Sequence, residues 1–195
     1  MMKKLIKDEL YSLEEYSNMR TEYKTKVRAH KENRIVRIGE NVSLHFEDYL
    51  TMRYQVQEML RAEKIFDAAG INEEIETYNP LIPDGQNWKA TMMIQFNKVE
   101  DRVKALAEMI GIERATWVQV EGFDKVSPIA NDDLERETEE KTSSVHFLRF
   151  ELTPEMATAA KQGAAINMGV EHAAYTQTCL PIAENFRESL VNDLN

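Results

Sequence analysis

The sequence predicts an α+β protein, with a mainly antiparallel sheet and long N-terminal helices packed against it. Apolar residues recur with helical spacing through most of residues 1–78, and the spacing changes to two from Trp88. Strand-like segments then alternate with helical ones, the usual order in α+β proteins. Because the chain has 195 residues, 43% of them hydrophobic, we expect one domain with a helical part (1–78) and a sheet-rich part (87–195).

The helical part contains two amphipathic segments joined by a hairpin. Ser12 and Glu15 have the spacing of a capping box, so a helix should begin beside them and end near His30. Residues 35–46, with Gly39 in the turn, should form a short β-hairpin. We expect one long helix over residues 47–69, ended by Gly70.

The sheet-rich part begins with an alternating strand at 88–96, whose apolar residues occupy every second position. Thr153 followed by Pro154 is typical of a helix start. The remaining expected elements are helix 99–110, a hairpin of 116–120 with 125–130, a charge-rich run 131–142, strand 144–152, strands 165–171 and 175–180, and a helix from Pro181.

Composition excludes several functional classes. The chain has 34 acidic and 24 basic residues, a net charge of −10, so it should repel nucleic acid. Its single cysteine, Cys179, can form no internal disulfide and cannot bind an iron–sulfur cluster alone. Walker A and Gly-x-Gly-x-x-Gly motifs are absent, so no nucleotide cofactor is indicated. Because we find no signal peptide or membrane-length apolar run, we expect a cytoplasmic protein without membrane contact.

The best candidate for a ligand site lies on the predicted long helix. Tyr54, Glu58 and Arg61 have the spacing i, i+4, i+7, and Gln57 lies beside them. An arginine held by a glutamate, next to a phenol and an amide, can orient a carboxylate or phosphate. The alternative is an exposed polar face with a weak Glu58–Arg61 ion pair.

The apolar loop 80–83 and the strand 144–152 add further candidates. Trp88 and Lys89 would complete a pocket wall between the long helix and the sheet, with His146 as an acid, a base or a ligand. Arg149 lies among aromatic residues, an arrangement that can mark an RNA-binding face, but the net charge favours a polar pair with Glu151. The candidate ligand-binding residues are Tyr54, Gln57, Glu58, Arg61, Trp88, Lys89, His146 and Arg149.

No single helix supplies two histidines to a metal. The sequence has no His-Glu-x-x-His motif and no Glu-x-x-His step of the di-iron type. A metal site assembled across strands remains an alternative, with His45, Glu47, His146 and His172 as its candidate ligands. The alternative role of each histidine is a structural hydrogen bond.

Three stretches, 46–61, 78–91 and 139–152, resemble an uncharacterised bacterial family classified as a domain of unknown function. They include Phe46-Glu-Asp-Tyr, Tyr78-Asn-Pro-Leu-Ile-Pro and Val145-His-Phe-Leu-Arg-Phe. Genes of that family tend to lie beside genes for rubrerythrin and for an iron–sulfur oxidoreductase of heterodisulfide-reductase type. The resemblance therefore implies an accessory protein of an oxidative-stress or redox system that binds such a partner. The alternative is a small-molecule or metal-dependent enzyme that uses the anion pocket.

Overall fold

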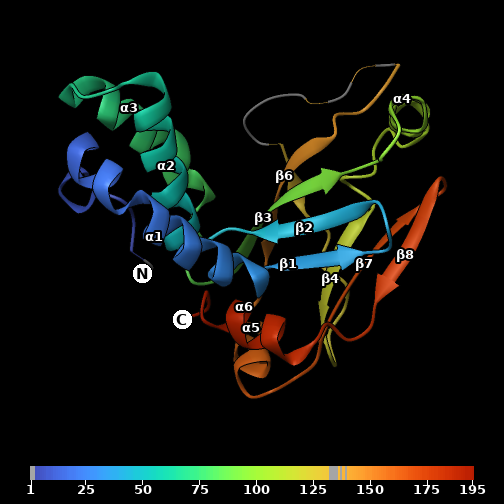
Figure 1. The fold of residues 1–195 in the computed structure, drawn as a ribbon. Helices are drawn as coiled ribbons and strands as arrows, with labels where there is room; N and C mark the ends of the chain where they lie inside the picture. Colours follow the sequence, from blue (N-terminus) through green and yellow to red (C-terminus); the bar gives the residue numbers. More distant parts are fainter. Residues whose placement is uncertain (1–2, 132–135, 137, 139) are drawn as a thin grey trace.

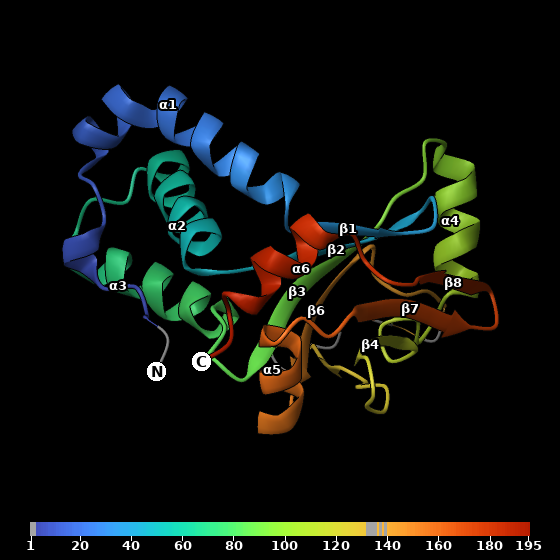
Figure 2. The same cartoon turned by 90° about the horizontal axis from the view of Figure 1, so that it is seen from below.

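The computed structural model describes residues 3–131, 136, 138 and 140–195, which form helices and two antiparallel sheets (Figures 1 and 2). The helices are η1 (Lys7–Glu9), α1 (Leu13–Glu32), α2 (Tyr49–Glu63), α3 (Ala68–Tyr78), η2 (Asn79–Leu81), α4 (Val99–Glu108), α5 (Pro154–Lys161) and α6 (Glu184–Val191). The strands are β1 (Ile35–Ile38), β2 (Val42–Phe46), β3 (Asn87–Ile94), β4 (Thr116–Val120), β5 (Ile129–Ala130), β6 (Val145–Glu151), β7 (Ile166–His172) and β8 (Tyr175–Cys179).

The two sheets share one hydrophobic core. The larger sheet has the order β1-β2-β3-β6-β5 and the smaller one β4-β7-β8, with all neighbouring strands antiparallel. Trp88 and Phe150 of the larger sheet belong to the same buried cluster as Val118 and Met168 of the smaller one. Helices α4, α5 and α6 add residues to this cluster. The α+β class with a mainly antiparallel sheet is therefore confirmed.

Helices α1, α2 and α3 pack chiefly against one another, beside the larger sheet (Figures 1 and 2). Their buried side chains form two clusters separate from the shared core. One contains Tyr16, Tyr23 and Val27 of α1, and the other contains Met52, Val56 and Leu60 of α2 with Ile75 of α3. The predicted capping box begins α1, where Ser12 and Glu15 satisfy each other's backbone N–H groups.

The expected single helix over 47–69 is wrong, because two helices occupy the region. Helix α2 ends at Glu63, and Lys64 takes the left-handed conformation, with φ of 57°. The Asp67 carboxylate then accepts a hydrogen bond from the Gly70 N–H and so caps α3. Gly70 consequently lies inside the first turn of the next helix instead of ending the previous one.

The expected hairpin of 116–120 with 125–130 is also wrong in its pairing. Strand β4 pairs with β7, and β5 pairs with β6 of the other sheet. Only Val118 and Val126 meet as an isolated bridge. The chain crosses between sheets near Pro128, which has no N–H to continue a ladder. Much of the run 131–142 lies outside the described residues.

The C-terminal segment is anchored by two buried side chains. Arg34, between α1 and β1, donates to the carbonyls of Phe46 and Glu47 and to the Asp193 carboxylate, the last at 2.5 Å. Trp88 Nε1 donates to the carbonyl of Leu190 in α6 at 2.9 Å. In the part of the chain that the structure describes, no helix is long and apolar enough to cross a membrane.

Candidate functional site

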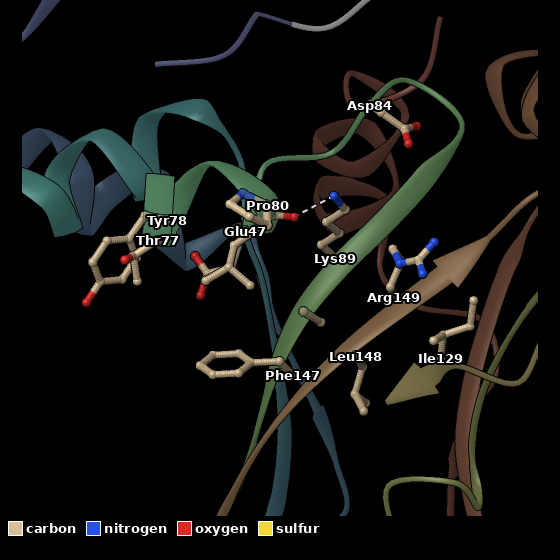
Figure 3. Close-up of a pocket in the computed structure, with 12 residues that line it drawn as sticks. Glu47, Thr77, Tyr78, Pro80, Asp84, Lys89, Ile129, Phe147, Leu148 and Arg149 are labelled. Atoms are coloured by element: carbon tan, nitrogen blue, oxygen red, sulfur yellow. Dashed lines mark hydrogen bonds between the residues drawn. The ribbon is translucent and has the colours of Figure 1, made fainter. Parts of the chain in front are cut away.

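A cavity of about 490 Å³ lies between the segment 77–84 and the larger sheet. Helix α3, η2 and the following loop form one side, and β3, β5 and β6 form the other (Figure 3). Its lining is mostly apolar, with four charged side chains. The lining residues are Glu47, Thr77, Tyr78, Pro80, Leu81, Asp84, Lys89, Ala90, Ile129, Phe147, Leu148 and Arg149.

Strand alternation determines which side chains face this cavity. Trp88, Ala90 and Met92 point into the shared core, so Lys89 and Thr91 project from the opposite face of β3. The same alternation on β6 leaves Arg149 on the face opposite the core. In the β3–β6 register, Lys89 lies directly opposite Arg149. The pairing therefore places two cationic side chains beside each other at the cavity wall.

Both cations also have partners within the protein. Lys89 Nζ donates to the carbonyl oxygens of Pro80 and Ile82, at 2.5 and 3.0 Å. Burial lowers the pKa of Lys89, and the nearby charges of Lys4 and Arg149 act in the same direction, whereas those of Asp84 and Glu151 oppose them. Arg149 forms an ion pair with Glu151 on the same strand. Since like charges directly opposite each other destabilise a strand pair, an anion between Lys89 and Arg149 would relieve the repulsion.

Glu47, at the junction of β2 and α2, supplies a carboxylate on the other side of the cavity. Its side chain is buried, with the residue only 8% exposed. Thr51 Oγ1 donates to Glu47 Oε2 at 2.7 Å, and Thr91 Oγ1 donates to Glu47 Oε1 at 2.9 Å. Figure 3 shows Glu47 on the side of Tyr78 and Phe147, away from Arg149. The cavity therefore has the Glu47 carboxylate toward one end and the cations Lys89 and Arg149, with Asp84 near them, toward the other, joined by apolar surface.

The loop that covers the cavity is held by hydrogen bonds within it and from Lys4. The Asp84 carboxylate accepts from the Gln86 N–H and from the Asn87 side-chain amide. Lys4 Nζ donates to the carbonyls of Asn79 and Ile82 at 2.9 and 2.7 Å. These contacts fix the loop over the sheet, so the cavity is a formed feature of the fold.

The face of α2 that the sequence predicts as a ligand site does not line this cavity. Its Glu58 contacts helix α1 instead. The Glu58 carboxylate accepts hydrogen bonds from Arg20 Nε and from the Tyr16 hydroxyl, both at 2.7 Å. The Arg20 contact lowers the pKa of Glu58 to about 2, so the pair stays ionised at neutral pH. Arg61 Nε is 3.7 Å from Glu58, and Tyr54 packs beside Tyr23. Glu58 is therefore occupied by α1, whose position the helix sequence does not reveal.

Gln57 and Trp88 are buried and do not line the cavity. The Gln57 amide pairs with the backbone N–H and carbonyl of Tyr11. Trp88 is fully buried in the shared core, on the opposite face of β3 from Lys89. Of the eight predicted ligand-binding residues, Lys89 and Arg149 are the two that line the cavity. The expected pocket between the long helix and the sheet lies instead between the segment 77–84 and the sheet.

His146 is fully buried on the core side of β6. Its Nδ1 lies 3.1 Å from the Asn131 side-chain amide, and its Nε2 lies 3.0 Å from the Ser143 carbonyl. Because that amide donates and the carbonyl accepts, these contacts suit a proton on Nε2. The buried Glu113 carboxylate lies 3.9 Å from Nδ1 and 3.3 Å from Arg114. His146 therefore does not reach the cavity.

The four candidate metal ligands do not gather into one site. His45 Nε2 lies 3.0 Å from Ser43 Oγ, and His172 Nε2 lies 3.0 Å from the carbonyl of Ile110. Glu47 is held by two threonines, and His146 lies in the core. Across the described residues, no group of three or more histidine, cysteine, aspartate or glutamate side chains is arranged to hold a metal.

Sequence reasoning missed most of the cavity. The sequence indicates Glu47 only as a candidate metal ligand and does not single out Tyr78, Ile129 or Phe147 as lining residues. The sequence does contain a signal for the cationic wall. Lys89 and Arg149 each occupy a position of an alternating strand that faces away from the core. Their pairing depends on the register between strands that are 60 residues apart, which sequence spacing does not reveal.

The comparisons with known proteins identify relatives but no activity. A family model described as "Protein of unknown function (DUF3501)" matches residues 4–194. A crystal structure of a "novel protein of unknown function" from Burkholderia pseudomallei K96243 is similar, with 44% sequence identity and a TM-score of 0.93. The match covers 99% of this chain and 100% of that one. No curated protein matches.

Proposed function

This chain belongs to the DUF3501 family of proteins of unknown function, and from its cavity we propose that it binds a small organic anion with an apolar body. The observation that carries the proposal is the placement of Lys89 opposite Arg149 at the wall of a largely apolar cavity. Ligand pockets typically enclose about 300–1,000 Å³ and combine apolar walls with a few polar groups. At about 490 Å³, this cavity has the size and lining for such a ligand.

The two cations favour a carboxylate over a neutral ligand. Arginine presents a planar fork that binds a carboxylate through two parallel hydrogen bonds, and lysine adds a point charge. The apolar part of the ligand would lie against Leu81 and Phe147. An anion at this position would raise the pKa of Lys89, which burial lowers, and would so favour the charged form of the lysine. The two cations and the apolar floor together favour a monocarboxylate with an apolar body over phosphate or a sugar.

Titration with hexanoate, benzoate and phenylacetate, followed by backbone amide NMR, tests this proposal. We expect saturable shifts at the amides of β3, β6 and the segment 77–84. Arg149→Gln should weaken binding by about tenfold, a typical loss for one charge-assisted hydrogen-bonding group. Lys89→Met should also weaken binding.

Arg61→Gln is the matched control, because it removes one positive charge from α2, away from the cavity. It should bind the three probes like the unmodified protein. The proposal fails if no probe gives a saturable shift at the cavity, or if Arg61→Gln weakens binding as much as Arg149→Gln. The latter result would favour the helix face predicted from the sequence.

The accessory role in a redox system remains a separate prediction, since it comes from the resemblance alone. It expects a complex with a rubrerythrin-like protein or an iron–sulfur oxidoreductase. Affinity purification from the native host under reducing conditions, with the partners identified by mass spectrometry, measures it. Recovery of neither partner would count against this role, whatever the result of the ligand titrations.

A further inference from the structure

The Glu47 carboxylate is buried beside the cavity without a charged partner of its own. Its two hydrogen bonds come from the neutral hydroxyls of Thr51 and Thr91, and no ion pair to Glu47 is found among the described residues. Burying a carboxylate is unfavourable unless hydrogen bonds or a positive charge compensate it. Glu47 nevertheless lies at a surface that a ligand can reach. A cationic group on the ligand would supply the missing charge.

The position of Glu47 relative to the cations follows from the sheet. Thr91, which holds Glu47 Oε1, is two residues along β3 from Lys89 and projects from the same face. Two residues of a strand span about 6.6 Å, so the acidic region and the Lys89–Arg149 region are offset along the sheet by roughly that length. Phe147, opposite Thr91 in the β3–β6 register, lies at the acidic end of the apolar floor.

We infer that the cavity selects a zwitterion, an amino-carboxylate whose ammonium group pairs with Glu47 and whose carboxylate pairs with Lys89 and Arg149. The inference rests on the proposed function, because it assigns the second end of the same ligand. An apolar spacer of several methylene groups between the two charges matches the offset along the sheet. Glu47 is then the specificity-determining residue, while Lys89 and Arg149 provide general affinity for carboxylates.

Three probes of one chain length separate these contributions. Hexanoate carries only the carboxylate, hexylamine only the ammonium group, and ε-aminohexanoate both. We expect ε-aminohexanoate to bind at least about tenfold more tightly than hexanoate, and hexylamine to bind most weakly. The measurement is the dissociation constant from backbone amide shifts at β3 and β6. The unmodified protein suffices for this comparison, so it does not depend on how a variant folds.

Glu47→Gln should abolish the preference for ε-aminohexanoate and leave hexanoate binding in place or improved. The matched control is Glu40→Gln, which removes one negative charge from an exposed position in the β1–β2 turn and should keep the preference. Thermal unfolding of each variant verifies that it is folded.

The outcomes distinguish the two proposals. If hexanoate binds at the cavity but ε-aminohexanoate binds no more tightly, the zwitterion inference fails and the anion-binding function stands. If Glu47→Gln keeps the full preference, Glu47 is not the selecting group and the inference again fails. If none of the carboxylate probes binds at the cavity, the proposed function itself is wrong.

Discussion

An Arg34→Met variant should lose about 3–5 kcal/mol of its free energy of unfolding, the usual effect of removing one partner of a buried ion pair. Arg34 is 1% exposed, and its guanidinium reaches Asp193 at 2.5 Å, as well as two backbone carbonyls. Methionine fills a similar volume but leaves the Asp193 carboxylate buried without its cation. Equilibrium unfolding in guanidinium chloride, followed by circular dichroism, measures the loss.

The loss should be larger at about pH 8 than at about pH 5. Burial raises the pKa of Asp193 to about 6 in the native state, above the ordinary value of 3.8, although Arg34 opposes the rise. A raised carboxyl pKa contributes stability at low pH that disappears as pH rises through the native value. Without Arg34 the pKa of Asp193 should rise further, so the variant can bury a neutral carboxyl group at pH 5 but not at pH 8.

A double variant, Arg34→Met with Asp193→Leu, controls for the buried charge. It removes both partners and should recover part of the lost stability, because no unpaired carboxylate remains. The carbonyls of Phe46 and Glu47 still lose their donor, so the recovery is incomplete. An Arg34→Met protein within about 1 kcal/mol of the unmodified one would show that the pair contributes little.

Trp88→Ala should destabilise the protein by about 3–5 kcal/mol, the range for truncating a large buried aromatic side chain. Trp88 is fully buried in the shared core, and its Nε1 donates to the Leu190 carbonyl. The substitution therefore opens a cavity in the core and removes one donor from the Leu190 carbonyl, which also accepts from the Asp193 N–H. Guanidinium chloride unfolding followed by far-ultraviolet circular dichroism measures the change.

Trp88→Phe separates packing from hydrogen bonding. Phenylalanine keeps most of the apolar contact but has no N–H for Leu190, so its loss should be about 1–3 kcal/mol. Equal losses for the two variants would show that the hydrogen bond alone accounts for the effect. A Trp88→Ala protein with an unchanged unfolding midpoint would contradict the buried position. Ligand binding should be retained in a folded Trp88→Phe protein, since Trp88 does not line the cavity.

The features that sequence predicted well are local. The capping box of Ser12 and Glu15 and the cap at Thr153 involve residues three apart, so their spacing is sufficient evidence. The alternation from Trp88 to Ile94 likewise follows from strand geometry alone. The boundary between α2 and α3 was missed because Lys64 adopts a conformation that lysine rarely takes.

The features that sequence missed depend on distant partners. Glu58 was expected to hold Arg61 for a ligand, but Arg20 of α1 reaches it from 38 residues away. Lys89 and Arg149 were both named, yet as parts of different candidate surfaces. Only the register of β3 with β6 places them opposite each other. The sequence points to Glu47 only as a candidate metal ligand, because its position near the apolar floor depends on the folded sheet.

The anchoring of the C-terminal segment has a consequence for folding kinetics. Arg34 meets Ser189 and Asp193 across 155 and 159 residues of chain, and Trp88 meets Leu190 across 102. Contacts of such long range slow folding, because the entropy of closing the loop is lost before the contact forms. During synthesis on the ribosome, the contact of Arg34 with Asp193 cannot form until nearly all of this sequence has emerged. The helices α1 and α2, whose contacts are more local, can assemble well before that.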